Sequence, residues 1–159
     1  DTISLTESVA AADIVRYTAT SEGGDSITGF ATGSDKFNFV DSAFGTLGTG
    51  SYTTVSQAFD TNVATTVNAL AAQGDSELYK ANITLFNFTS DLATLENAIT
   101  GGVHTGAAFF AVSDGTNTKV YYDSNTDSGT DGSGLTHIAT LSGVGNADTG
   151  LATADFQAV

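Results

Sequence analysis

Short apolar stretches separated by turn-forming residues are the feature that most restricts what this sequence can fold into. The first 45 residues contain the runs "TISL", "DIVRY", "DSITGF" and "DKFNFV", with Gly, Ser, Asp and Thr between them. Runs of this length with a turn signal at each end are typical of short β-strands. Phe30, Phe37 and Phe39 are expected to form the buried face of this segment.

A tight hairpin is predicted in the last third of the chain. The sequence "AAFFAVS" is followed by "DGTN" and then by "TKVYY", and Asp114-Gly115 favours a tight turn between two antiparallel strands. A strand "THIATL" and a short tail "LATADFQAV" come later. Together with the first segment, this pattern predicts a mainly β fold of short strands, similar to a β-sandwich.

The middle of the chain, residues 52–102, has a mixed pattern. Apolar residues recur at helical spacing over 61–74, whereas residues 77–88, "ELYKANITLFNF", favour a strand. A second short helix is expected over 90–102, where a serine precedes the apolar residues and two glycines end the segment. One or two short α-helices are therefore predicted inside a single domain of 159 residues.

The charge of the chain restricts its partners. Asp and Glu number 18 against 4 Lys and Arg, and the formal net charge is -14. A surface without a basic patch disfavours nucleic acid and anionic membrane as partners, and favours divalent cations. No apolar run approaches the roughly 18 residues that span a bilayer, so membrane insertion is not expected.

Residues that carry catalytic chemistry are few. The chain has no cysteine, which excludes disulfides, a thiolate zinc site and a thiol nucleophile. Its two histidines, His104 and His137, belong to no paired-ligand pattern, and neither a nucleophile elbow nor a phosphate-binding loop occurs. The sequence therefore predicts a protein that is not an enzyme.

One loop concentrates oxygen-bearing side chains. In "DSNTDSGTDGSG", residues 123–134, four such residues stand among glycines and serines: Asp123, Asn125, Asp127 and Asp131. Residues two apart in an extended backbone point the same way, and calcium takes six to eight oxygen ligands. The loop is not an EF-hand, because Ser128 and Gly134 occupy positions that require Gly and Glu. A calcium site and a polar turn between strands both remain open on these residues alone.

Two further segments carry a resemblance to a known family. "SEGGDSITGFATGSDKFNF", residues 21–39, resembles the segment that closes the calcium-loaded β-roll of repeats-in-toxin (RTX) proteins. "FFAVSDGTNTKVYYDSNTDSG", "LTHIATLSGV" and "LATADFQAV" are similar to the C-terminal module of bacterial proteins exported by type I secretion, including serralysin-like proteases and some surface-layer proteins. The likeness covers residues 1–45 and 105–159, about two-thirds of the chain.

The resemblance implies a fold, ligands and a location. Residues 1–45 would be a β-roll-closing segment, 52–102 an insert, and 105–159 the hairpin, acidic loop and secretion-signal region of a longer exported protein. Calcium would be the bound ion. The residues implied as its ligands are Asp25 and Asp35, with Gly23 and Gly33 giving carbonyls, and Asp123, Asn125 and Asp127 in the loop. The secretion address would lie around Ala154, Asp155 and Phe156.

Three functions are compatible with these observations. The first is a non-catalytic calcium-binding module, secreted or on the bacterial cell surface, that folds on calcium and caps or exports a type I secreted protein. The second is a self-assembling subunit of a surface layer, matrix fibre or adhesive filament. The third is an accessory C-terminal domain of a secreted hydrolase. Calcium ions, a second copy or neighbouring domains of the same protein are the expected partners.

Overall fold

The protein is mainly β, as the sequence predicts. The computed structural model describes residues 1–9, 11–44, 50–51, 54–60, 78–83, 87–94, 107–124, 134–147 and 149–159. The strands in these ranges are β1 (Thr2–Ser4), β2 (Ile14–Tyr17), β3 (Asp25–Thr28), β4 (Lys36–Phe39), β5 (Gly50–Ser51), β6 (Thr54–Asp60), β7 (Leu78–Ile83), β8 (Ala108–Ser113), β9 (Thr118–Asp123), β10 (Leu135–Ser142) and β11 (Phe156–Ala158). Two 3-10 turns join them, η1 (Thr20–Glu22) and η2 (Thr153–Asp155).

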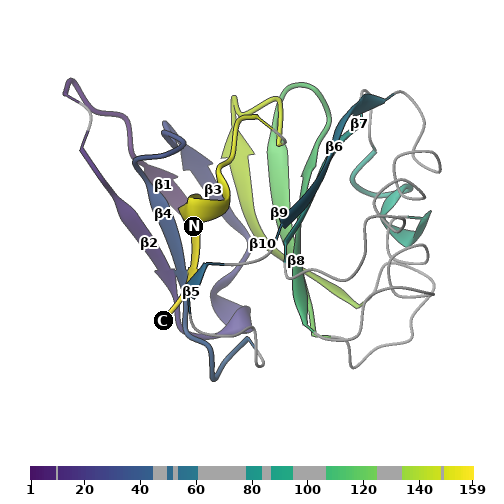
Figure 1. The fold of residues 1–159 in the computed structure, drawn as a ribbon, viewed down its shortest axis with the longest axis horizontal. Coiled ribbons are helices and arrows are strands. Elements are labelled where there is room, and N and C mark those ends of the chain that lie inside the picture. The colour runs from purple at the N-terminus through teal and green to yellow at the C-terminus, as the bar shows by residue number, and fades with distance from the viewer. Residues whose placement is uncertain are drawn as a thin grey trace.

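The described strands form two sheets. The larger has the order β1-β3-β10-β9-β8-β7-β6, and the smaller has the order β2-β4-β11-β5. Figure 1 shows the small sheet beside the β1, β3 and β10 part of the large one, with both chain ends next to the small sheet. Strands β6 to β9 extend the large sheet away from this region.

The chain winds through the two sheets as a coil. Strand β1 lies in the large sheet and β2 in the small one, and β3 and β4 repeat this order, each parallel to its predecessor in the same sheet. Strands β10 and β11 make a third turn, because β10 pairs in parallel with β3 and β11 with β4. We call these turns the first, second and third coils. The segment between β4 and β10 is thus inserted between two coils that are neighbours in space.

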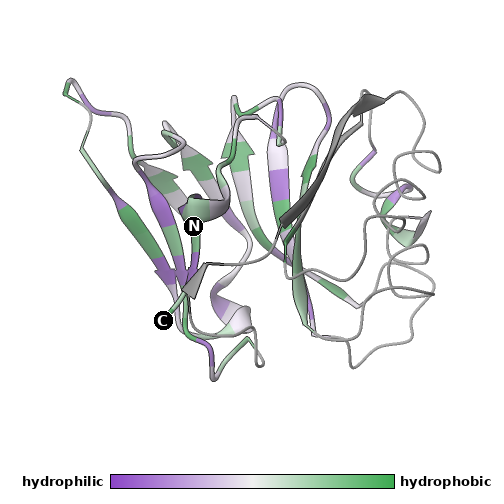
Figure 2. Ribbon diagram, in the orientation of Figure 1, coloured by the Kyte–Doolittle hydropathy of each residue, from purple (hydrophilic) through white to green (hydrophobic). Residues whose placement is uncertain are grey.

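Alternating side chains explain why each coil buries one face. Buried and more exposed residues alternate along β2, β3, β4 and β11, and on β4 and β11 this alternation coincides with alternating hydrophobic and hydrophilic residues (Figure 2). This period of two is what a strand with one covered face requires. The predicted buried face is confirmed, since Phe37 and Phe39 have no exposed surface and Phe30 is 8% exposed.

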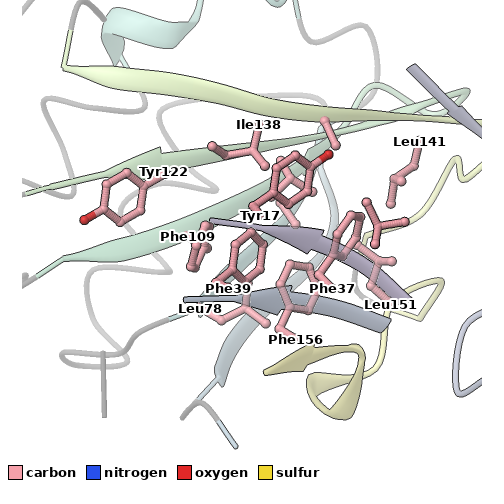
Figure 3. Packing of buried hydrophobic residues seen from close by; sticks show 14 of the residues in the cluster. Tyr17, Phe37, Phe39, Leu78, Phe109, Tyr122, Ile138, Leu141, Leu151 and Phe156 are labelled. Atoms are coloured by element: carbon pink, nitrogen blue, oxygen red, sulfur yellow. The ribbon is translucent and has the colours of Figure 1, made fainter. Parts of the chain in front are cut away.

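Aromatic rings fill the space between the sheets (Figure 3). The Phe156 ring centroid in the third coil lies 5.5 Å from that of Phe37 in the second. The Phe39 ring lies 5.7 Å from Tyr17 in the first coil and 4.1 Å from Phe109 of the large sheet. These contacts join all three coils and both sheets into one core.

The predicted hairpin is present. Strands β8 and β9 are antiparallel neighbours, and the backbone N–H of Asp114 donates to the carbonyl of Asn117 at their turn. The Asp114 carboxylate accepts the N–H groups of Thr116 and Asn117, each at 2.8 Å. All six residues of β8 are buried, so both faces of this strand are covered.

The predicted insert is described only in part. Strand β7 falls within the strand expected over 77–88, and residues 92–94 are helical where a helix is expected over 90–102. The helix expected over 61–74 lies outside the described residues.

If the third coil is part of the core, removing its central ring must destabilise the whole domain. We expect Phe156→Ala to lower the free energy of unfolding by about 3–5 kcal/mol, because a large buried side chain leaves a cavity. Its neighbour Gln157 is partly exposed on the outer face, and Gln157→Ala should change stability by about 0.5 kcal/mol or less. Urea denaturation measures both; equal effects would contradict this packing.

Candidate functional site

Asp35 joins the first and second coils. It stands just before β4 and is 2% exposed. Its Oδ2 accepts the backbone N–H of Ala31 in its own turn at 2.8 Å. Its Oδ1 accepts the N–H of Asp13, in the first coil, at 3.1 Å. Each oxygen of this buried carboxylate therefore accepts one backbone N–H.

Asp155 joins the third coil to the second in the same way. It has no exposed surface, and its Oδ2 accepts the N–H of Ala152 in its own turn at 2.8 Å. In the second coil, the hydroxyl of Thr32 donates to Oδ2 at 2.8 Å and the N–H of Gly33 to Oδ1 at 2.9 Å. Gly33 has a φ of 78°, a left-handed conformation that glycine adopts at little cost.

Asp25 lies at the opposite end of β3 from this turn and faces the core. It is 7% exposed, and the hydroxyl of Tyr17 donates to its Oδ2 at 2.9 Å. The α-amino group of Asp1 lies 2.8 Å from its Oδ1. Burial, and then the hydrogen bond to the Asp25 carboxylate, raises the pKa of Tyr17 above its ordinary value, so the hydroxyl stays a donor.

Close packing against β10 explains the glycine at position 23, two residues before Asp25. A Cβ at Gly23 would lie 2.5 Å from the carbonyl oxygen of His137, and the N–H of Gly24 donates to the carbonyl of Ile138. The turn therefore approaches β10 more closely than a side chain allows. Asp25 and Gly23 lie at the start of β3, whereas Asp35 and Gly33 lie in the turn between β3 and β4. That these residues bind calcium stays a prediction.

A small cavity adjoins Asp35. It has a volume of about 210 Å³ and lies between the turns of the first and second coils, where two acidic residues, Glu7 and Asp35, contribute to its lining. The Glu7 carboxylate accepts the N–H of Ala11. Across the described ranges of the chain, no three His, Cys, Asp or Glu side chains come close enough to hold a metal ion.

The acidic loop begins at a buried residue. Strands β9 and β10 are antiparallel, and Asp123 is paired with Leu135 at the end of this ladder. Asp123 is 1% exposed. The other predicted ligands of the loop, Asn125, Asp127 and Asp131, lie outside the described residues.

The predicted secretion segment is packed into the fold. Phe156 belongs to the core and Asp155 to the contact between coils. The carbonyl of Ala154 accepts a hydrogen bond from Lys36 Nζ at 3.0 Å. In the folded protein these residues therefore form part of the third coil, at and just before the start of β11.

Two buried polar groups were not singled out from the sequence. Tyr17 is 2% exposed and holds Asp25, while Lys80 on β7 is 6% exposed and donates from Nζ to the carbonyl of Leu151 at 2.9 Å. A lysine inside the apolar run "ELYKANI" is the signal that could have identified the second.

His137 is the one histidine among the residues that the structure describes. Its Nε2 lies 3.0 Å from Thr140 Oγ1, and its ring centroid lies 5.5 Å from that of Tyr121. Burial, followed by the charge of Lys119, lowers the pKa of His137. Both the histidine and the threonine lie on β10 within the sheet, and the ring contact is ordinary packing.

Comparison of this chain with known protein families, curated proteins and solved structures identifies no relative. No family model, no curated protein and no solved structure matches this chain. Among the described residues, no helix is long and apolar enough to cross a membrane.

The contact made by Asp155 can be tested by its removal. We expect Asp155→Ala to lower the free energy of unfolding by about 2–4 kcal/mol, because a fully buried carboxylate and its three part-buried hydrogen bonds, from Thr32, Gly33 and Ala152, are lost. Asp91 provides the matched control, since it also accepts a backbone N–H, from Asn87, but is more exposed. Asp91→Ala should lower stability by about 1 kcal/mol or less in the same denaturation experiment. A loss equal to that of the control would contradict the role of Asp155.

Proposed function

We propose that this chain is a non-catalytic, calcium-binding structural module of an exported bacterial protein. The observation that carries the proposal is the placement of the acidic loop. It connects two antiparallel neighbours, β9 and β10, and begins at Asp123, a carboxylate with 1% exposure. A fixed ladder therefore holds one end of an oxygen-rich loop against the core.

The distribution of acidic residues supports the loop as the site. The carboxylates of Asp35 and Asp155 already accept two and three hydrogen bonds, respectively, within the coil turns. The loop instead concentrates carboxylates and an amide in a dozen residues of a chain whose net charge is -14. A hard divalent cation coordinated by these oxygens would relieve their repulsion. The proposed calcium ligands are Asp123, Asn125, Asp127 and Asp131.

The proposed mechanism is folding controlled by compartment. Calcium is scarce inside the cell, so repulsion within the loop would keep the exported chain loose. At millimolar calcium outside, a site with a dissociation constant of about 10⁻⁴ to 10⁻³ M would fill. Type I secretion would read the terminal residues, around Asp155 and Phe156, before they enter the third coil.

A second candidate function is an assembly subunit of a surface layer, fibre or filament. One observation favours it: among the described residues, β1 and β2 of the first coil are the outermost strands of the two sheets, and Ile14 on β2 is 60% exposed. An exposed apolar side chain on an outer strand can contribute to a contact with another chain.

Calcium should stabilise the folded protein measurably. At a calcium concentration tenfold above the dissociation constant, one site adds about 1.4 kcal/mol, which raises Tm by about 3–6 °C in a domain of this size. Thermal unfolding followed by circular dichroism, with calcium and with chelator, measures the shift. We expect the double variant Asp127→Asn, Asp131→Asn to lose most of it.

The matched control removes the same charge elsewhere. Glu7→Gln combined with Asp114→Asn also deletes two negative charges but leaves the loop intact, so its response to calcium should equal that of the wild type. An unchanged Tm on adding calcium to the wild type contradicts the proposal. If the loop variant and the control show the same calcium-dependent shift in Tm, the calcium ion binds at a site other than the loop.

A further inference from the structure

Two of the four basic residues of the chain lie on the outer face of the small sheet. They are Arg16 on β2, which is exposed, and Lys36 on β4, which is partly exposed. Of the other two, Lys80 is 6% exposed, and Lys119 Nζ lies 4.7 Å from the centroid of the Phe88 ring. Strands β2 and β4 are parallel neighbours at one side of the molecule (Figure 1). Half of the basic residues are therefore concentrated on one sheet face.

The strand registers place these cations in a polar array. Buried residues of β2, β4 and β11 alternate with more exposed ones, so the more exposed ones point away from the core. Arg16 is paired with Asn38, Asn38 with Gln157, and Ile14 with Lys36. We call these five residues the polar sheet face. Because side chains stand above and below a sheet, this face does not depend on which strand is outermost.

Neither cation of the polar sheet face is neutralised by a carboxylate. Among the residues that the structure describes, no aspartate or glutamate forms an ion pair with Arg16 or Lys36. Lys36 Nζ donates to the carbonyl of Ala154, which leaves two of its three donors for other partners. A chain with 18 acidic residues thus keeps both cations of this face available to an anion from outside.

One buried acceptor on this face lacks a donor. The Oδ1 atom of Asn38 is almost fully covered and accepts no hydrogen bond in the described part of the chain. Asn38 lies between Arg16 and Gln157 in the row across the sheet, and its side chain is otherwise partly exposed. An acceptor in this state destabilises the folded protein unless a donor reaches it. A ligand hydroxyl supplies that donor after a small rotation of the amide.

The composition of the face argues against a protein as its occupant. The buried centre of a protein–protein contact is enriched in aromatic and apolar side chains. The polar sheet face has no aromatic residue, and Ile14 is its one apolar side chain. Guanidinium, ammonium and amide groups instead suit a ligand that is rich in hydroxyl groups and also carries negative charge.

The net charge of the chain limits how acidic that ligand is. With a formal net charge of -14, the molecule repels a densely charged polymer such as nucleic acid. A ligand with few, separated carboxylates escapes most of this repulsion, because salt at 0.1 M screens exposed charges more than about 10 Å apart. The two unpaired cations then attract one carboxylate at short range.

We propose that the polar sheet face binds an acidic oligosaccharide in which uronic acid units alternate with neutral sugars. One carboxylate lies between Arg16 and Lys36, which are diagonal neighbours on adjacent strands with long side chains. Neutral units lie over Asn38 and Gln157, whose amides both donate to and accept from sugar hydroxyls. The saccharide crosses the strands of the small sheet and uses no residue of the acidic loop.

The test is isothermal titration calorimetry of the full chain with a hyaluronan hexasaccharide, with calcium present. The wild type binds this saccharide and does not bind neutral cellohexaose. Arg16→Gln and Lys36→Gln each remove one positive charge and keep a polar side chain. Each substitution weakens binding by about tenfold or more, because a charge-assisted hydrogen bond is lost.

Lys119→Gln is the matched control. It deletes the same charge from the large sheet, so its affinity for the hexasaccharide equals that of the wild type. If Arg16→Gln, Lys36→Gln and Lys119→Gln weaken binding equally, the effect is one of net charge alone and the proposal is overturned.

Gln157→Glu tests the same face by adding a negative charge. Gln157 is partly exposed and glutamate has nearly the same shape, so the circular dichroism spectrum stays that of the wild type. Repulsion of the ligand carboxylates lowers the affinity by about tenfold or more. A wild type that binds no acidic saccharide, or an Arg16→Gln variant that binds as tightly as the wild type, overturns the proposal. Equal or tighter binding of a hexaglutamate peptide also overturns it, because an acidic protein segment is then the occupant.

Discussion

The hydrogen bonds between turn carboxylates and the backbone of the preceding coil are the interactions on which this fold depends. Asp155 and Thr32 are 123 residues apart in sequence, yet their side chains are 2.8 Å apart. Bringing such distant segments together carries a loop-closure cost before any contact is made. A charged acceptor with three donors gives a strong, directional gain at the place where that closure occurs.

Patterns local to the sequence predicted much of the fold. The buried phenylalanines of the first segment and the hairpin at Asp114 depend on neighbouring residues alone, because alternation and turn chemistry act over a few positions. The third coil did not follow from the sequence. Nothing between residues 135 and 158 indicates that β10 and β11 pair in parallel with β3 and β4, since strand partners are chosen by long-range packing.

The candidate site was harder to predict because oxygen atoms serve two purposes. An aspartate before a strand, such as Asp35, can coordinate a cation or accept backbone N–H groups, and both uses need the same carboxylate in the same kind of turn. The structure places N–H donors around Asp35 and Asp155. For Asp25 the donor is a tyrosine hydroxyl from another strand, which no local pattern indicates.

The inserted segment is more than a connection between coils. The chain leaves the coil after β4 and re-enters it at β10, and the two coils on either side pair directly with one another. The segment nevertheless supplies part of the core, because the Phe109 ring on β8 lies 4.1 Å from that of Phe39 and β9 pairs with β10. A replacement of another length or kind would have to provide the same ring and the same strand edge, so the host winding and its guest are one structural unit.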